Sequence, residues 1–324
     1  MSASLACVII GRNEGERLRR CLESVLPRSA KVVYVDSGST DGSVELARSL
    51  GAEVVALDMR QPFTAARARN AGFAALQDLP VDAYVQFVDG DCEVRADWLA
   101  RAQAFLAEHP KTAAVAGRRR ERYPERSIYN RLCDMEWAVP VGPAKACGGD
   151  AMMRAQALRE VGGYRDDLIA GEEPELCVRL RARGWNIHVI DAEMTLHDAA
   201  MTRFRQWWLR ILRSGYAYAE GVHLHGAPPE RHGVQALRSA LAWAFGPPLA
   251  TVLAAFLVGP WALGLLGVYP LQMIRLFFRE RGDARSRALR AIFLVLGKFP
   301  ETQGALRYWR LKTLRRSGPL IEYK

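Results

Sequence analysis

Short apolar runs alternate with amphipathic stretches along the N-terminal part of the chain. The apolar runs have the length of buried β-strands and lie at 5–10, 31–36, 53–57 and 83–88. Between them, apolar residues recur at helical spacing over 14–26, 41–50 and 64–77. This order predicts an α/β, Rossmann-like fold with a mostly parallel sheet that binds ligands beyond the carboxyl ends of its strands.

The pattern changes in the second half of the chain. It is irregular from 112 to 153, which is typical of a substrate-facing insertion. Regular patterns return as a helix at 172–183, a strand at 186–190 and a helix at 202–220. Gly226-Ala-Pro-Pro229 then breaks the chain, so we expect a first domain at 1–235 and a second region at 236–324.

The second region begins with an apolar segment. Residues 239–274 contain no Asp, Glu, Lys or Arg, and a membrane-spanning helix needs about 20 such residues. Pro247-Pro248 and Gly259-Pro260 should interrupt it. A broken hairpin or an interfacial segment is favoured, because a single span over 249–268 would place the following basic residues on the non-cytoplasmic side. A buried helical hairpin of a soluble domain is the remaining alternative.

Positive charge is confined to the C-terminal part of the chain. The formal net charge is +10, yet residues 1–235 are neutral, and between 275 and 316 twelve Lys or Arg residues face three acidic ones. This distribution disfavours nucleic-acid binding and places the basic segment beside anionic lipid. The six cysteines show no C-x-x-C spacing and the first apolar run is too short for a signal peptide, so we expect reduced thiols and a cytoplasmic location.

Short polar residues follow the first two predicted strands. Val8 to Glu14 and Val35 to Gly42 lie where a strand ends and a helix begins, a position suited to gripping a base and ribose. The carboxylate of Asp36 suits an imide N–H or ribose hydroxyls. Ordinary turn and cap chemistry explains these residue types equally well.

Two further clusters carry carboxylates. Asp89 and Asp91 close an apolar strand, where they are placed to hold Mg²⁺ or Mn²⁺ against a diphosphate; a solvated turn is the alternative. Glu172 and Glu173 open a helix, where a carboxylate is either a simple cap or a rigidly held general base.

Taken together, these motifs over residues 4–220 resemble the family 2 glycosyltransferases, which have a GT-A fold. Asp89-Gly-Asp91 resembles their D-x-D metal motif, and Gly148-Gly-Asp150 resembles the acceptor-side loop. Glu172-Glu173 stands where the family usually has Glu-Asp, whose second carboxylate is the catalytic base. The longer Glu173 side chain leaves open which of the two glutamates is the base.

The same resemblance implies the donor-binding residues. The strand and loop ending at Asn13-Glu14 and the stretch 34–42 around Asp36 resemble the nucleotide-binding part. Ala66 to Gly72 resembles the segment in which an Arg and an Asn face the donor, here Arg67 and Asn70.

Three residues further along fit the family less tightly. In related enzymes a histidine near His197 completes the metal site, although a lone histidine is more often structural. Arg205-Gln-Trp-Trp-Leu-Arg210 partly matches the Q-x-x-R-W motif of processive members. Arg210 and Arg213, on one helical face, are candidates for binding the diphosphate.

The resemblance implies an inverting, metal-dependent glycosyltransferase on the cytoplasmic face of a membrane. Its donor would be a nucleotide-diphosphate sugar, and its acceptor a lipid-linked or other glycan. A Rossmann dehydrogenase is disfavoured, because Gly11-Arg-Asn-Glu-Gly15 is not G-x-G-x-x-G. A membrane-tethered, non-catalytic adaptor with a degenerate transferase domain is the other alternative, and the intact carboxylates argue against it.

Overall fold

The computed structural model describes residues 4–314, which form two compact units. The first takes in the described residues up to Pro124 and Cys133–Ala200. The second takes in Glu125–Leu132 and the described chain from Met201 onward.

Every strand and helix predicted for the first unit is present close to its expected bounds, except that the strand predicted at 186–190 continues to His197. These elements are β1 (Leu5–Gly11), α1 (Glu16–Val25), β2 (Lys31–Asp36), α2 (Ser43–Ser49), β3 (Glu53–Ala56), α3 (Ala65–Ala74), β4 (Tyr84–Asp89), α7 (Glu172–Ala182) and β9 (Asn186–His197). The short 3₁₀ helix η1 (Leu26–Arg28) follows α1. The remaining elements were not predicted: β5 (Cys92–Val94), α4 (Trp98–Glu108), β6 (Thr112–Glu121), β7 (Gly142–Ala144), β8 (Ala151–Arg154) and α6 (Ala155–Glu160). Helix α5 (Ile128–Glu136) crosses from the second unit into the first.

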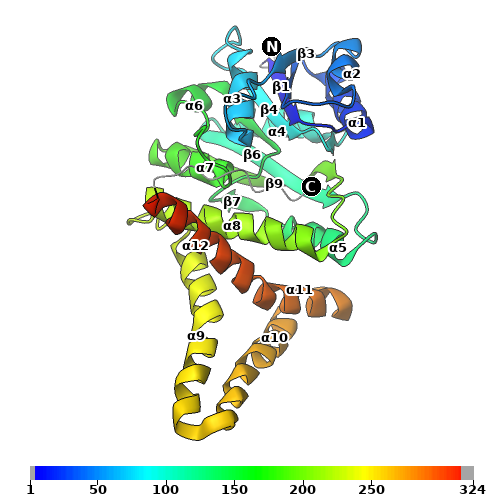
Figure 1. Cartoon of the computed structure of the whole chain (residues 1–324). Helices are drawn as coiled ribbons and strands as arrows, with labels where there is room; N and C mark the ends of the chain where they lie inside the picture. The colour runs from blue at the N-terminus through cyan, green and yellow to red at the C-terminus, as the bar shows by residue number, and fades with distance from the viewer. Residues whose placement is uncertain (1–3, 315–324) are drawn as a thin grey trace. The chain divides into compact units, whose positions relative to one another are not determined.

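The strands form one mixed sheet in the order β3-β2-β1-β4-β8-β6-β9-β5, with β7 beside β9 (Figure 1). The half built from β3, β2, β1 and β4 is parallel, as expected. The prediction of a mostly parallel sheet does not extend to the other half. There β6 runs parallel to β9, but β8 runs antiparallel to β4 and β6, and β5 and β7 run antiparallel to β9. The stretch with the irregular pattern at 112–153 therefore contributes strands to the sheet that the sequence did not predict.

The parallel half brings three strand ends together. Strand β1 is buried from Leu5 to Ile10, which is why it reads as a continuous apolar run. Its register pairs Gly11 with Asp36 of β2 and Ile10 with Asp89 of β4. The loops after β1, β2 and β4 consequently begin at one edge of the sheet.

Helix α3 packs on β1 at close range through Gly72. A Cβ atom at this position would lie 2.3 Å from Cγ1 of Val8, so only glycine fits. The close approach fixes the preceding turn of α3, which carries Arg69 and Asn70, against the sheet.

The second unit is helical. It contains α8 (Phe204–His225), α9 (Val234–Val258), the 3₁₀ helix η2 (Gly259–Gly267), α10 (Val268–Arg279), α11 (Ala284–Leu296) and α12 (Lys298–Thr313). Helix α8 crosses α12 in backbone contact: a Cβ on Gly215 would lie 1.9 Å from the carbonyl oxygen of Glu301. Because α8 packs on α12, the boundary between the compact units falls at residue 200, whereas the sequence placed the domain boundary near 235. A catalytic domain that extends to 235 stays a prediction.

The apolar segment forms a helical hairpin whose chain reverses at Gly259, where φ is +62° (Figure 1). The predicted break at Gly259-Pro260 is confirmed, but Pro247-Pro248 lies inside α9 and does not interrupt it. Proline at 247 lacks the N–H that would bond the carbonyl of Trp243. The hydroxyl of Tyr269 donates to that carbonyl at 2.7 Å, so the returning arm of the hairpin supplies the missing bond.

The hairpin exposes large apolar side chains around its turn. Phe256, Leu257 and Trp261 are 84%, 86% and 87% exposed. Among the described residues, Val234–Arg279 is the one helical stretch long and apolar enough to cross a membrane by length and composition alone. Only 11% of its most apolar window is buried, so the segment is not a core hairpin of this unit.

Candidate active site

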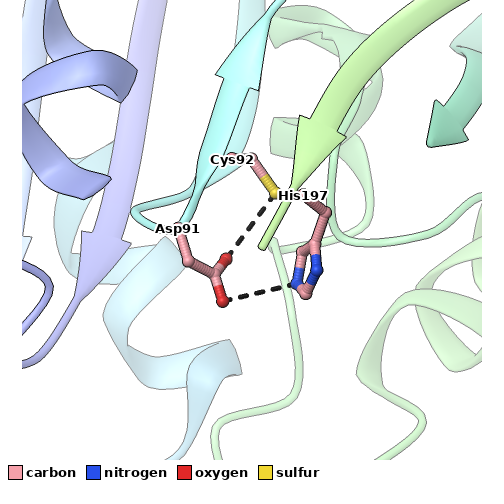
Figure 2. A group of neighbouring side chains, drawn as sticks. All are labelled: Asp91, Cys92 and His197. Carbon is pink, nitrogen blue, oxygen red and sulfur yellow. Dashed lines mark hydrogen bonds and ion pairs between the residues drawn. The ribbon is translucent and has the colours of Figure 1, made fainter. Parts of the chain in front are cut away.

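Asp91, Cys92 and His197 converge at the edge of the sheet (Figure 2). Cys92 and His197 are paired residues of the antiparallel strands β5 and β9, so their side chains lie on the same face. Nε2 of His197 lies 3.3 Å from Oδ2 of Asp91, and Nδ1 lies 3.8 Å from Glu121. All three side chains are buried. This set of one carboxylate, one imidazole and one thiol suits a divalent cation.

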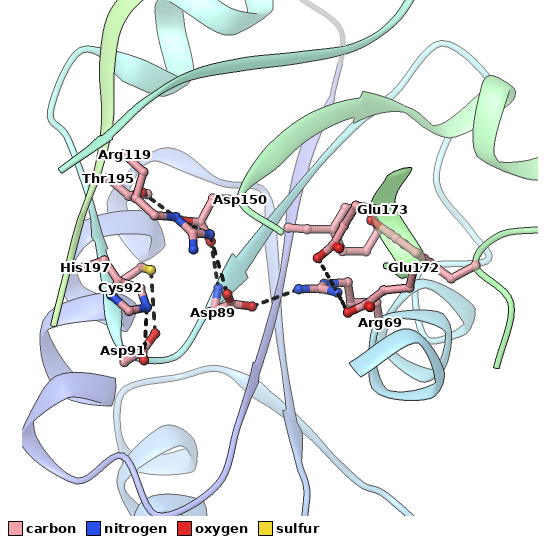
Figure 3. Close-up of polar contacts among 12 residues, drawn as sticks. Arg69, Asp89, Asp91, Cys92, Arg119, Asp150, Glu172, Glu173, Thr195 and His197 are labelled. Atoms are coloured by element: carbon pink, nitrogen blue, oxygen red, sulfur yellow. Dashed lines mark hydrogen bonds and ion pairs between the residues drawn. The ribbon is translucent and has the colours of Figure 1, made fainter. Parts of the chain in front are cut away.

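Asp89 lies beside this cluster, between the buried Arg69 and the half-buried Arg119 (Figure 3). Its oxygens lie 2.9 Å from Nη2 of Arg69 and 3.5 Å from Nη2 of Arg119. Asp150 is fully buried; it accepts a hydrogen bond from the backbone N–H of Asp89 at 3.1 Å and another from the hydroxyl of Thr195 at 2.7 Å. Asp89 is thus held by its neighbours in both backbone and side chain.

Arg69 connects Asp89 to the two glutamates at the start of α7. Its Nη1 atom lies 3.0 Å from carboxylate oxygens of both Glu172 and Glu173. The guanidinium fits only because residue 149, in the loop before β8, is a glycine. A Cβ atom at Gly149 would lie 2.4 Å from Nη2 of Arg69. One guanidinium therefore joins the residues predicted to bind the metal to those predicted to contain the base.

The electrostatics of this cluster favour a proton-transfer role for Glu173. Burial, reinforced by the charges of Glu172 and Asp89, raises the pKa of Glu173 to about 7, although Arg69 opposes the shift. Burial alone would lower the pKa of Arg69, but Glu173, Asp89 and Glu172 outweigh it and raise that pKa. Arg69 therefore stays charged while Glu173 can exchange a proton near neutral pH.

The loops after β1 and β2 are tied to each other. Asp36 accepts hydrogen bonds from the backbone N–H groups of Gly38 and Ser39 at 2.9 and 3.0 Å. Asn13 accepts one from the backbone N–H of Thr40 at 2.7 Å, and Glu14 pairs with Arg17 at 2.8 Å. These are the contacts of ordinary turns and caps, so the nucleotide-binding role of Asn13, Glu14 and Asp36 stays a prediction.

Arg67 and Asn70 contact protein groups. Arg67 donates to the backbone carbonyls of Asp58 and Pro62. Asn70 donates to the carbonyl of Tyr164 at 2.8 Å and accepts from its N–H at 2.9 Å, which fastens α3 to the loop before α7. Their donor-binding role is not tested, and the arginine of this segment that enters the cluster is Arg69.

Arg210 and Arg213 are half-buried on α8, in the second unit, together with the two tryptophans of the partial motif. Trp207 packs edge-on against Phe293 of α11 with ring centroids 4.8 Å apart, which is a core contact of that unit. The diphosphate-binding role of the two arginines stays a prediction.

Sequence reasoning missed several residues of the cluster. Arg119 and Glu121 lie on β6, which was not predicted, so no local signal marked them. Asp150 lies in the Gly148-Gly-Asp150 loop and Arg69 in the segment from Ala66 to Gly72, but the sequence assigned no separate role to either residue. Cys92 directly follows the Asp89-Gly-Asp91 motif.

Cys147 and Cys177 also meet, at an Sγ–Sγ distance of 3.6 Å, although no sequence spacing paired them. Cys147 directly precedes the Gly148-Gly149-Asp150 loop, and Cys177 lies one helical turn beyond Glu173. This contact packs the loop against the N-terminal part of α7.

The comparisons with known proteins agree with this geometry. Residues 6–161 match the model of Glycosyl transferase family 2. The chain contains a family 2 glycosyltransferase domain. The protein is therefore a glycosyltransferase, and the predicted enzyme class is confirmed.

Two relatives are similar to this glycosyltransferase over more than half of its length. It is 28% identical over 281 residues to the succinoglycan biosynthesis protein ExoA of Rhizobium meliloti, covering 82% of this chain and 84% of the relative. It is 26% identical over 202 residues to the glycosyltransferase AglE of Haloferax volcanii, covering 58% of this chain and 64% of the relative.

Solved structures confirm the GT-A fold. The mannosyltransferase PcManGT from Pyrobaculum calidifontis, solved with GDP-Man and Mn²⁺, superposes with a TM-score of 0.61 at 18% identity, covering 95% of this chain and 88% of the other. Glucosyl-3-phosphoglycerate synthase from Mycobacterium tuberculosis, solved with Mn²⁺, UDP and phosphoglyceric acid, gives a TM-score of 0.51 at 19% identity, covering 70% and 80%.

Proposed function

We propose that this glycosyltransferase moves a sugar from a nucleotide-diphosphate sugar to a hydroxyl of a glycan acceptor, with inversion and with a divalent cation. One observation carries the proposal: Arg69 joins Asp89 to Glu172 and Glu173 at the edge where three strands end. A metal site and a base held this close suit a reaction in which a hydroxyl is deprotonated as a diphosphate departs.

The residues fit the metal that such a reaction uses. Asp89, Asp91 and His197 would hold Mg²⁺ or Mn²⁺, and a bound cation supplies charge neutralisation for the leaving diphosphate. Glu121 supports the fit, because it faces the far nitrogen of His197 and leaves Nε2 toward Asp91. Asp150 and Arg119 hold Asp89 in place on the other side.

Glu173 is the better candidate for the base. The side chain of Glu173 is 15% exposed, whereas that of Glu172 is 5% exposed and hydrogen-bonded to Arg69. A base must reach the acceptor hydroxyl, which favours the more accessible carboxylate. In its ionised form Glu173 takes the proton of the attacking hydroxyl, and Glu172 holds Arg69 in position.

The donor would lie across the loops after β1 and β2. In this proposal Asn13, Glu14 and Asp36 bind the nucleoside, and Arg67 and Asn70 shape the donor side of α3. Arg210 and Arg213 are candidate partners of the diphosphate. Support for a nucleotide-sugar donor comes from the solved relatives with bound GDP-Man and UDP.

The acceptor is proposed to be lipid-linked, with the protein on the cytoplasmic face of the membrane. The chain reverses at Gly259, so both ends of the apolar hairpin leave on the same side of its tip. From Phe245 to the end of α9 the helix rises about 20 Å, less than the roughly 30 Å of a hydrocarbon core. A hairpin of this depth would anchor the protein in membrane lipid from one side, near a lipid-linked acceptor.

A screen of nucleotide sugars tests the proposal. The full chain is incubated with each donor, with and without Mn²⁺, and donor hydrolysis and thermal stabilisation are measured. We expect one donor to be turned over and to stabilise the protein only when the cation is present. Equal turnover of that donor in EDTA would refute the metal role, and retention of the anomeric configuration in the product would refute the inverting mechanism.

A further inference from the structure

We propose that Cys92 is a third protein ligand of the metal site and makes the site selective for thiophilic divalent cations. This inference rests on the metal site of the proposed function. It adds the sulfur of Cys92 to the carboxylate oxygens of Asp89 and Asp91 and the imidazole nitrogen of His197.

The distances fit coordination by all three side chains. Sγ of Cys92 lies 3.6 Å from Oδ1 of Asp91, Nε2 of His197 lies 3.3 Å from Oδ2 of Asp91, and one ligand atom from each residue lies within 4.8 Å of the others. Tetrahedral bonds of about 2.0–2.3 Å place ligand atoms roughly 3.3–3.8 Å apart. The two spacings from Asp91 fall in this range, and the spacing between Cys92 and His197 is below 4.8 Å, so side-chain rotation would close the set on a cation (Figure 2).

The backbone fixes Cys92 in this position. Its pairing with His197 across β5 and β9 directs both side chains to one face of the sheet. Cys92 also belongs to a second group of three with Asp89 and Asp150, whose ligand atoms satisfy the same distance limit. The thiol thus lies within 4.8 Å of an oxygen of each predicted metal carboxylate, Asp89 and Asp91.

The surroundings of His197 orient it for the same site. Nδ1 of His197 faces Glu121, which accepts hydrogen bonds from the backbone N–H groups of Tyr123 and Ala199 at 3.1 and 3.0 Å. The ring of Trp137 packs edge-on against His197 with centroids 4.7 Å apart. A carboxylate behind a histidine is the usual support of a metal-binding imidazole.

The chemistry of sulfur determines which cations this site prefers. Mg²⁺ binds oxygen ligands, whereas Zn²⁺, Co²⁺ and Cd²⁺ bind thiolates strongly. When the metal–sulfur bond forms, the S–H bond of Cys92 breaks and its proton passes to solvent. We therefore expect thiophilic cations to bind more tightly than Mg²⁺ and to displace it.

Cobalt spectroscopy on the full chain tests this without measuring turnover. Co²⁺ should produce a sulfur-to-cobalt charge-transfer band in the near ultraviolet, and Cd²⁺ should raise the melting temperature. Cys92→Ser should lose the band and bind Cd²⁺ at least about tenfold more weakly, with a smaller change for Mn²⁺. Cys7→Ser is the matched control: its thiol is also buried but contacts Ser29, outside the cluster, and this variant should keep the band.

The outcomes separate this proposal from the proposed function. Stabilisation by Mn²⁺ without any cobalt–sulfur band overturns the role of Cys92 and leaves the metal-dependent reaction intact. Persistence of the band in Cys92→Ser also overturns it. If no cation shifts the melting temperature of the wild type, the metal site itself is refuted. Cys92→Ala replaces the serine variant if that one does not fold.

Discussion

Charged residues are usually exposed and apolar residues usually buried, but two regions of the molecule show the reverse. They are the cluster of charged side chains around Asp89 and Asp91, and the apolar hairpin. The cluster buries charge: Asp91, Asp150 and Arg69 are at most 5% exposed. The hairpin exposes apolar surface, with Phe256, Leu257 and Trp261 more than 80% exposed. Buried charges need partners, and exposed apolar patches mark interaction sites.

The two regions therefore differ in the kind of partner that they call for. The cluster already balances much of its charge internally through Arg69 and Arg119, so a bound cation would rearrange existing ion pairs. Among residues 4–314, the large apolar side chains at the turn of the hairpin stay exposed, which is why we propose an external apolar partner for them. Five experiments test this contrast.

Asp91→Ala should abolish turnover, because it removes the carboxylate closest to His197. The fold should persist, since the strands around the cluster pair through their backbones. Turnover and Mn²⁺-dependent donor binding are the measurements, with circular dichroism as the folding check. Asp97→Ala, a change to an exposed carboxylate outside the cluster, is the control and should leave both unchanged.

Glu173→Gln should lower kcat by roughly 10²–10⁴ while donor binding is retained, because the amide cannot accept the proton. Glu172→Gln is the matched variant on the same turn and should lose less. The two kcat values decide the assignment: an inactive Glu172→Gln beside an active Glu173→Gln would move the base by one residue.

Replacing Phe256, Leu257 and Trp261 together with Ser should release the full chain from lipid vesicles, even in low salt. Each of these exposed side chains contributes about 1.5–3 kcal/mol when it is buried in an apolar medium. Vesicle co-sedimentation measures the effect, and Met59→Ser with Val81→Ser, at exposed apolar positions of the first unit, is the control. A full chain that is monodisperse without detergent and ignores vesicles would contradict the membrane proposal. A chain truncated at 235 is unsuitable for this test, because it would lack α12, which packs on α8.

Arg281→Gln with Arg285→Gln should weaken binding to anionic vesicles by roughly fivefold per residue, about 1 kcal/mol each. Both side chains are exposed, whereas Arg287 packs over Phe277 and Arg290 pairs with Glu280. Binding to neutral vesicles should hardly change. An equal loss on neutral and anionic vesicles would show that the two arginines act through the structure of the hairpin and not through charge.

The pH profile of kcat should rise through about pH 7. Glu173 acts as a base only when ionised, and its pKa is raised to about 7, so the rate should fall about tenfold for each unit below that value. The acidic limb should disappear from the residual activity of Glu173→Gln. A limb that persists in this variant would assign the titration to another group.

Local patterns in the sequence predicted most of the fold and the outline of the site. Strands β1, β2 and β4 of the parallel half read as apolar runs because they are buried on both faces, whereas β3 is only partly buried. Asp89 and Asp91 follow such a run directly, and Glu172 and Glu173 begin a helix, so their positions depend on neighbouring residues. The uncharged segment 239–274 and the break at Gly259-Pro260 are equally local features.

Which distant residues meet depends on how the whole chain folds. Cys92 and His197 come together through strand pairing, Arg119 reaches Asp89 from an unpredicted strand, and Cys147 meets Cys177 across 30 residues. Pro247 stays within a helix because a hydroxyl from the returning arm bonds the carbonyl that it leaves free. Periodicity reports which face of an element is buried, whereas strand register and helix crossing determine what that face touches. These contacts depend on the whole chain, and no local pattern specifies them.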